Sequence, residues 1–142
     1  MDYFKAIEIS AAGMAAQQAR VEAATLNIAN MNTTAAAGRL GYQPVSAVIS
    51  SMPVSFSQVL AADSRPLVIP HASLMPQIGV SPRKVYEPGH PDADTAGMVS
   101  YPGINHTQEM MTVVTALRAY EANLAALQAT KTLAVKALEI GS

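Results

Sequence analysis

Apolar residues recur at helical spacing near both ends of the chain, and this regularity stops in between. In the first segment, Ile7, Met14, Val21 and Ile28 return every seven residues, which places them on one side of a helix. The pattern predicts a helix from about Tyr3 to Asn30. The positions that accompany this stripe are small or polar, so the predicted contact surface is narrow.

The strongest periodic signal follows Asn105. Asn105 and Gln108 together resemble a capping box, in which the Asn side chain accepts a hydrogen bond from a free backbone N–H. Beyond them, apolar positions alternate spacings of three and four residues, with a lapse at Lys131: Met110, Val113, Leu117, Tyr120, Leu124, Leu127, Ala134 and Leu138. A helix of about 35 residues would be roughly 50 Å long, so we expect the first helix to lie along it.

Proline marks off the middle of the chain. All nine prolines lie between Pro44 and Pro102, and proline disrupts helix interiors. Short apolar pieces bounded by Pro and Gly are typical of strands joined by irregular turns. The pieces that predict strands here are Val45–Ile49, Val54–Phe56, Leu67–Ile69 and Val80–Tyr86.

These patterns predict a mainly α fold. Long N- and C-terminal helices pair as an α-helical, coiled-coil-like core, and a small β-rich or extended insert separates them. We divide the chain into residues 1–34, 35–104 and 105–142, and we expect the first and last segments to form one structural unit.

Composition changes the interpretation of the apolar stripes. The chain is 50% hydrophobic but only 5% aromatic, so much of its apolar content is alanine and methionine. Small side chains bury little area each, at roughly 25 cal/mol per Å². A long apolar stripe on such a chain favours packing against neighbouring chains over an entirely intramolecular core.

Charge and residue content exclude several classes of function. The net charge is −1, and the nine basic residues form no cluster, which argues against nucleic-acid binding. The chain has no cysteine, which removes disulfides, thiolate metal sites and cysteine nucleophiles. We see neither a signal-peptide pattern at the N-terminus nor an apolar run long enough to predict a membrane-spanning helix.

One segment contains residues that could in principle bind a metal. His90, Asp92 and Asp94 lie in a Gly- and Pro-flanked segment, and His and Asp are metal ligands. In such a segment, however, Asp side chains more commonly stabilise turns. No nucleophile elbow, phosphate-binding loop, dinucleotide fingerprint or zinc-protease helix occurs. We therefore expect no catalytic residues, no metal and no cofactor.

Several blocks of the sequence carry a further signal. The run 27–33 reads Asn-x-Ala-Asn-x-x-Thr, which is similar to a signature of flagellar rod and hook proteins. Segments 86–99, 102–111 and 118–123 resemble the bacterial flagellar basal-body rod proteins of the FlgC, or proximal-rod, type. Gly103 departs from that family, which usually has Asn there. The matching signature residues are Asn27, Ala29, Asn30, Thr33, Pro88, His90, Pro91, Asp94, Gly97 and Asn105.

The resemblance implies a structural role. It implies that the chain is exported without a cleaved signal by the flagellar type III export apparatus, and that it self-assembles through its terminal helices in the periplasmic rod. That rod is the hollow shaft that transmits motor torque and serves as an export channel. The implied partners are copies of the chain itself, other proximal and distal rod proteins, the MS ring and the rod-base adaptor, with no nucleic acid and no small-molecule substrate.

Three alternatives remain from the sequence. Another flagellar rod or axial protein would share the Asn/Thr signature but not the segment around His90 and Pro91. A cytoplasmic module that captures a partner helix would use the same apolar stripe. An enzyme would need chemistry from the segment that contains His90.

Overall fold

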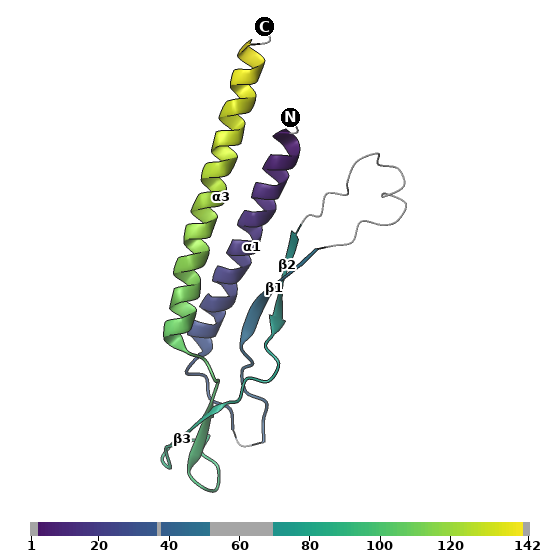
Figure 1. The fold of residues 1–142 in the computed structure, drawn as a ribbon. Coiled ribbons are helices and arrows are strands. Elements are labelled where there is room, and N and C mark those ends of the chain that lie inside the picture. The colour runs from purple at the N-terminus through teal and green to yellow at the C-terminus, as the bar shows by residue number, and fades with distance from the viewer. Residues whose placement is uncertain (1–2, 37, 52–69, 141–142) are drawn as a thin grey trace, which may run out of the picture.

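The computed structural model describes residues 3–36, 38–51 and 70–140. Two long helices dominate this part of the chain, and short strands lie between them in sequence (Figure 1). In chain order the elements are α1 (Tyr3–Asn30), β1 (Val45–Ser51), β2 (Pro70–Pro76), β3 (Arg83–Tyr86), β4 (Met98–Tyr101) and α3 (His106–Ile140). This arrangement confirms the predicted mainly α fold with a small β insert.

The two helices lie side by side and run in opposite directions (Figure 1). The end of α1 lies beside the start of α3, where the Asn27 and Glu109 side chains meet at 3.2 Å. Because α3 has 35 residues and α1 has 28, the C-terminal end of α3 extends past the N-terminal end of α1. Pairing of the terminal helices is thus confirmed, whereas coiled-coil geometry stays a prediction.

The strands form antiparallel pairs within the described part of the chain. β1 pairs with β2 in a register that runs from Val45 opposite Pro76 to Ser51 opposite Pro70, and this ribbon packs against α1. β3 pairs with β4, with Val85 opposite Val99, beyond the end of α1 (Figure 1). An isolated bridge between Ala35 and Ser100 ties the segment after α1 to this hairpin.

The structure finds β1 where Val45–Ile49 was predicted and β3 within Val80–Tyr86. The predicted strands Val54–Phe56 and Leu67–Ile69 lie outside the described residues. β2 and β4 were not predicted.

The start of α3 is fixed by side-chain capping. Asn105 Oδ1 accepts hydrogen bonds from the backbone N–H groups of Thr107 and Gln108, at 3.1 and 3.3 Å. These groups have no partner inside the helix, so the cap stabilises this end by about 1 kcal/mol. The predicted boundary of the helix at Asn105 is correct.

Gly103 lies at a close approach of two backbone segments. A Cβ atom there would overlap the carbonyl oxygen of Ser81 and crowd the Val80 side chain. Its φ is not in the left-handed region, which in the described residues is occupied by Gly38, Gly79 and Gly97. Glycine is therefore required here by lack of space, not by an unusual backbone conformation.

The buried core consists mostly of small side chains. Among the described hydrophobic residues, Ala16, Ala23, Ala24, Ala116 and Val99 are buried. Four of these alanines lie on α1 and α3, so the two helices contact each other through small residues and their backbones approach closely. In the part of the chain that the structure describes, neither helix has the length and hydropathy of a membrane span.

Candidate assembly site

Asn27 is the polar centre of the junction between α1, β1 and α3. It is only 1% exposed, and its Nδ2 donates to the Val45 carbonyl oxygen at 2.9 Å and to Glu109 Oε1 at 3.2 Å. Its Oδ1 accepts from the Val45 N–H at 2.8 Å and from the Tyr42 hydroxyl at 3.0 Å. These bonds use both donors and both lone pairs of the amide. The buried polar group is therefore fully satisfied.

The charge of Glu109 affects the pKa of Tyr42, which lies in the same junction. Burial and, second, the Glu109 carboxylate raise the pKa of the Tyr42 hydroxyl above its usual range. Both causes disfavour an ionised phenol. Tyr42 therefore stays protonated and continues to donate its hydrogen bond to Asn27.

The other residues of the Asn/Thr signature terminate α1. Asn30 Nδ2 donates to the Leu26 carbonyl oxygen at 2.8 Å, and the Thr33 hydroxyl donates to Asn30 Oδ1 at 3.4 Å. The Thr33 N–H donates to the Asn30 carbonyl oxygen at 3.0 Å, which closes a turn after the helix. Ala29 lies on the exposed side of α1. The signature thus combines one buried junction residue, Asn27, with a helix end.

The segment around His90 forms a compact turn system between β3 and β4. The His90 N–H donates to the Glu87 carbonyl oxygen at 3.0 Å, and His90 Nδ1 accepts from the Asp92 N–H at 3.1 Å. Asp92 Oδ2 accepts from the Thr34 hydroxyl at 2.5 Å, so this turn is tied to the segment that follows α1. The flanking residues Pro88 and Pro91 are exposed.

Asp94 organises the second half of this turn system. Its Oδ1 accepts from the N–H groups of Ala96 and Met98, at 2.8 and 2.9 Å. The hydrogen bond from Met98 is the main reason that the pKa of Asp94 lies below its usual range; Ala96 and Lys84 add to the shift, and partial desolvation opposes it. Asp94 is thus engaged by backbone amides, the turn-stabilising role of Asp.

Gly97 is required by both conformation and space. Its φ is +73°, and a Cβ atom would lie 3.0 Å from Tyr86 Cε2 and 3.2 Å from Pro88 Cβ. The described residues contain no group of three or more His, Cys, Asp or Glu side chains placed to hold a metal ion.

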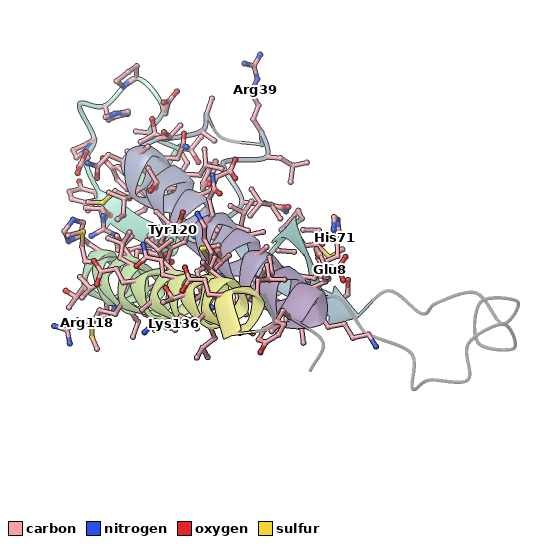
Figure 2. All side chains as sticks on the ribbon, turned by 90° about the horizontal axis from the view of Figure 1, so that it is seen from above. Glu8, Arg39, His71, Arg118, Tyr120 and Lys136 are labelled. Atoms are coloured by element: carbon pink, nitrogen blue, oxygen red, sulfur yellow. The ribbon has the colours of Figure 1, made fainter. Side chains whose placement is uncertain are left out.

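The two predicted helical stripes meet at one place on the surface of the helix pair. Val21 of α1 lines a shallow hollow together with Leu117 and Tyr120 of α3, and no strand residue contributes to it. In Figure 2, Tyr120 lies at the boundary between the two helices, whereas Arg118 points away from them. We call the following residues the apolar face: Ile7, Met14, Val21, Ile28, Met110, Val113, Leu117, Tyr120, Leu124 and Leu127.

The chain covers the apolar face only in part. Ile7, Met14, Val21, Ile28, Val113 and Leu127 are half-buried, and Met110, Leu117, Tyr120 and Leu124 are exposed. Leu117 is 48% exposed, in contrast to 2% for the neighbouring Ala116. The buried hydrophobic residues of the two helices are therefore alanines, and the residues of the predicted stripes are more exposed. Leu138, at 76% exposed, continues the stripe past the end of α1.

Comparison with known proteins identifies the family. The flagellar basal-body rod protein FlgC of Bacillus subtilis (strain 168) is 34% identical to this chain, over 99% of both sequences. The chain belongs to the FlgC family of flagellar basal-body rod proteins. Relatives in this family include FlgC of Aquifex aeolicus (32% identical, over 98% of this chain and 97% of the relative) and FlgC of Salmonella typhimurium (28%, over 94% of both).

A family model described as the C-terminal region of the flagellar basal body rod FlgEFG proteins matches residues 95–140. This range covers β4 and all of α3. The FlgC resemblance drawn from the signature blocks is thus confirmed.

The sequence patterns did not predict several residues that make contacts at the Asn27 junction and in the turn system around His90. Tyr42 and Glu109 complete the Asn27 junction, and Thr34 holds Asp92. Glu109 had one usable signal, because it lies four residues after the cap residue Asn105 in the first turn of α3. Tyr42 and Thr34 carried no signal, since their partners are 15 and 58 residues away in sequence.

Proposed function

We propose that this FlgC-family chain is a structural subunit of the proximal rod, which assembles through its terminal helices into the hollow shaft of the flagellum. Its role is to transmit motor torque and to enclose the export channel. The single observation that supports this most directly is the apolar face. Val21 of one stripe lines a hollow with Leu117 and Tyr120 of the other, and Met110, Leu117 and Leu124 are exposed.

The energetics support packing against neighbouring chains. Fully burying a Leu, Met or Ile side chain contributes about 1.5–3 kcal/mol, so covering the exposed members of the apolar face would contribute several kcal/mol per subunit. Scattered exposed apolar residues are normal in monomers, but contiguous apolar patches mark interaction surfaces. Residues 1–34 and 105–142 act together as the structural unit that carries this face.

The partners and location follow from the family. We propose contacts with copies of the chain, with other proximal and distal rod proteins, and with the MS ring and rod-base adaptor. We further propose that the flagellar type III apparatus exports the chain to the periplasm without a cleaved signal. The role is structural, with no enzyme activity, cofactor, nucleic acid or small-molecule substrate.

Complementation tests this function. A strain that lacks its own copy of the gene is given the full chain, and basal bodies are purified from swimming cells. We expect restored swimming and the chain in the rod fraction. Deletion of residues 107–142 should abolish both, because it removes α3. Swimming restored by the deleted chain would contradict the proposal, as would a full chain found only as a soluble cytoplasmic pool, which would instead favour a helix-binding module.

A further inference from the structure

Gly13 and Asn123 make a close contact between α1 and α3, far from the Asn27 junction. Gly13 is the single glycine of α1. A Cβ atom built on it would lie 3.0 Å from Asn123 Nδ2 and 3.2 Å from both Cγ and Oδ1. The whole amide group of Asn123 therefore packs against the bare backbone of Gly13, where any other residue would place a side chain.

This contact shares its register with the Asn27 junction. Gly13 precedes Asn27 by 14 residues (27 less 13), and Asn123 follows Glu109 by 14 residues (123 less 109). Fourteen residues are two heptads, or about 21 Å of helix. Two contacts that each involve an asparagine side chain, with equal spacing on both helices, thus define one antiparallel alignment.

The surface between these two contacts does little to fix the position of α1 along the axis of α3. Its buried residues are alanines, including Ala16, Ala23 and Ala116, and their side chains are alike and small. A surface of methyl groups packs about as well after a small axial shift, whereas a polar side chain at a helix contact can specify register. The Asn27 junction fixes the alignment of α1 and α3 at one end of the helix pair. This constraint becomes weaker with distance along the two helices.

We propose that Gly13 and Asn123 are a positioning pair that fixes the axial register and separation of α1 against α3 at the end distant from Asn27. The inference rests on the proposed assembly function. A fixed register keeps the stripe on α1 and the stripe on α3 in one axial alignment within the apolar face. A neighbouring subunit would then meet one continuous surface.

The proposal predicts that Gly13→Ala weakens the packing of α1 on α3, whereas helix propensity alone predicts that the same change stabilises α1. Alanine is a better helix former than glycine, so Gly13→Ala should strengthen α1 if Asn123 can move aside freely. If the amide must stay seated, the added methyl group forces the helices apart. Removing the amide with Asn123→Ala should make room for that methyl group.

The experiment uses full-length variants in the complementation strain, with swimming-ring diameter and the amount of chain in purified basal bodies as readouts. We expect Gly13→Ala to reduce both to about half or less. Asn123→Ala removes the amide that fixes the register, so it should lower both readouts, but less than Gly13→Ala does. The double variant Gly13→Ala/Asn123→Ala should match Asn123→Ala. Ala15→Ser is the matched control, because it adds one heavy atom at an exposed position of α1 and should have no effect.

Recovery in the double variant would support the pair, since a general defect of α1 would not be relieved by a change in α3. Normal behaviour of Gly13→Ala would overturn the proposal. So would normal behaviour of Asn123→Ala, or a double variant as defective as Gly13→Ala. If the wild-type chain itself fails to complement, the assembly function is overturned. The unfolding midpoints of the purified chains then decide the pair, which requires Gly13→Ala to be less stable than the double variant.

Discussion

At the scale of single residues, Asn27 shows why a short signature can matter more than a long apolar stripe. Its amide joins α1 to β1 and α3 through four hydrogen bonds and is almost fully buried. Only an amide of this length supplies two donors and two acceptors from that position. Aspartate is the same size but has no donors, and alanine would leave Glu109 and Val45 without partners.

We predict that Asn27→Asp severely destabilises the chain. It removes both donors and places a second carboxylate beside Glu109 in a buried site, at a cost of about 3–5 kcal/mol. Urea unfolding of the purified chain, followed by circular dichroism, measures this. The matched control is Asn32→Asp, an identical change at an exposed position, which should shift the free energy of unfolding by less than about 0.5 kcal/mol.

A second-site change makes this prediction specific. Glu109→Gln in the Asn27→Asp background would supply an amide donor to the new carboxylate and should recover part of the lost stability. Equal stability of the single and double variants would show that the Asn27–Glu109 contact is not what the substitution disrupts.

We also predict an acid transition confined to the turn around Asp94. Folding lowers the pKa of Asp94. Its contribution is therefore fully present above the unfolded pKa, about 3.9, and is lost as the pH falls through the lower folded value. The amide NMR signals of Ala96 and Met98 should report this transition. In Asp94→Asn they should stay constant, because the amide oxygen still accepts but does not titrate. A wild-type transition at or above the ordinary carboxyl range would contradict the assignment.

At the scale of elements, one side of each helix packs against the other helix, and an adjacent side carries the apolar face. The buried hydrophobic residues of α1 and α3 are alanines, and the larger apolar residues of the apolar face are only partly covered. The sequence predicted the bounds of α1, the start of α3 and their pairing, because periodicity, capping and the distribution of proline are local signals. It could not show which small residues make the contact, since an alanine at the interface looks like any other alanine of a helix.

We predict that Leu124→Asp and Ala116→Asp fail in different ways. Leu124 is 37% exposed, so the purified Leu124→Asp chain should unfold at nearly the wild-type urea concentration but should not restore swimming. Ala116 is buried, so a charge there should cost several kcal/mol in the isolated chain itself. Ala122→Asp, which adds the same charge at an exposed position outside the apolar face, is the control. Normal swimming with Leu124→Asp would show that Leu124 faces solvent in the assembled rod.

The short strands explain why the middle of the chain was harder to predict. β4 has only four residues, Met98–Tyr101, and its buried Val99 depends on pairing with β3, while Ser100 bridges to Ala35. None of these relations leaves an alternating pattern in so short a run. The Asn27 junction is similar, because its contacts to Val45 and Glu109 span 18 and 82 residues of sequence.

At the scale of the whole molecule, the long helix pair ends unevenly. α3 continues past the start of α1, and Leu133, Val135 and Leu138 on its last turns are exposed (Figure 1). Isolated helical turns without tertiary contacts are only marginally stable in water. The stability of the terminal part of α3 therefore depends on contacts with neighbouring chains more than that of any other part of the helix pair.

We predict that assembly protects this part of α3 selectively. In the isolated chain, backbone amides beyond about Leu133 should exchange hydrogen faster than those around Ala116, because local opening there breaks few contacts. In purified rods, the same amides should become strongly protected, whereas those around Ala116 should change little. Hydrogen exchange read by mass spectrometry compares the two states. Equal protection of the last turns in both states would mean that they have no neighbour in the rod.

The crowded position of Gly103 has an evolutionary consequence. Because a Cβ there would overlap the Ser81 carbonyl oxygen, every single-step change at this codon meets the same obstacle, whatever the new side chain. In a relative with a larger residue at this position, the 80–81 backbone must lie farther away than it does here. The two segments can therefore diverge only together, and exchanging either one alone between relatives should produce an incompatible hybrid although both parents are functional.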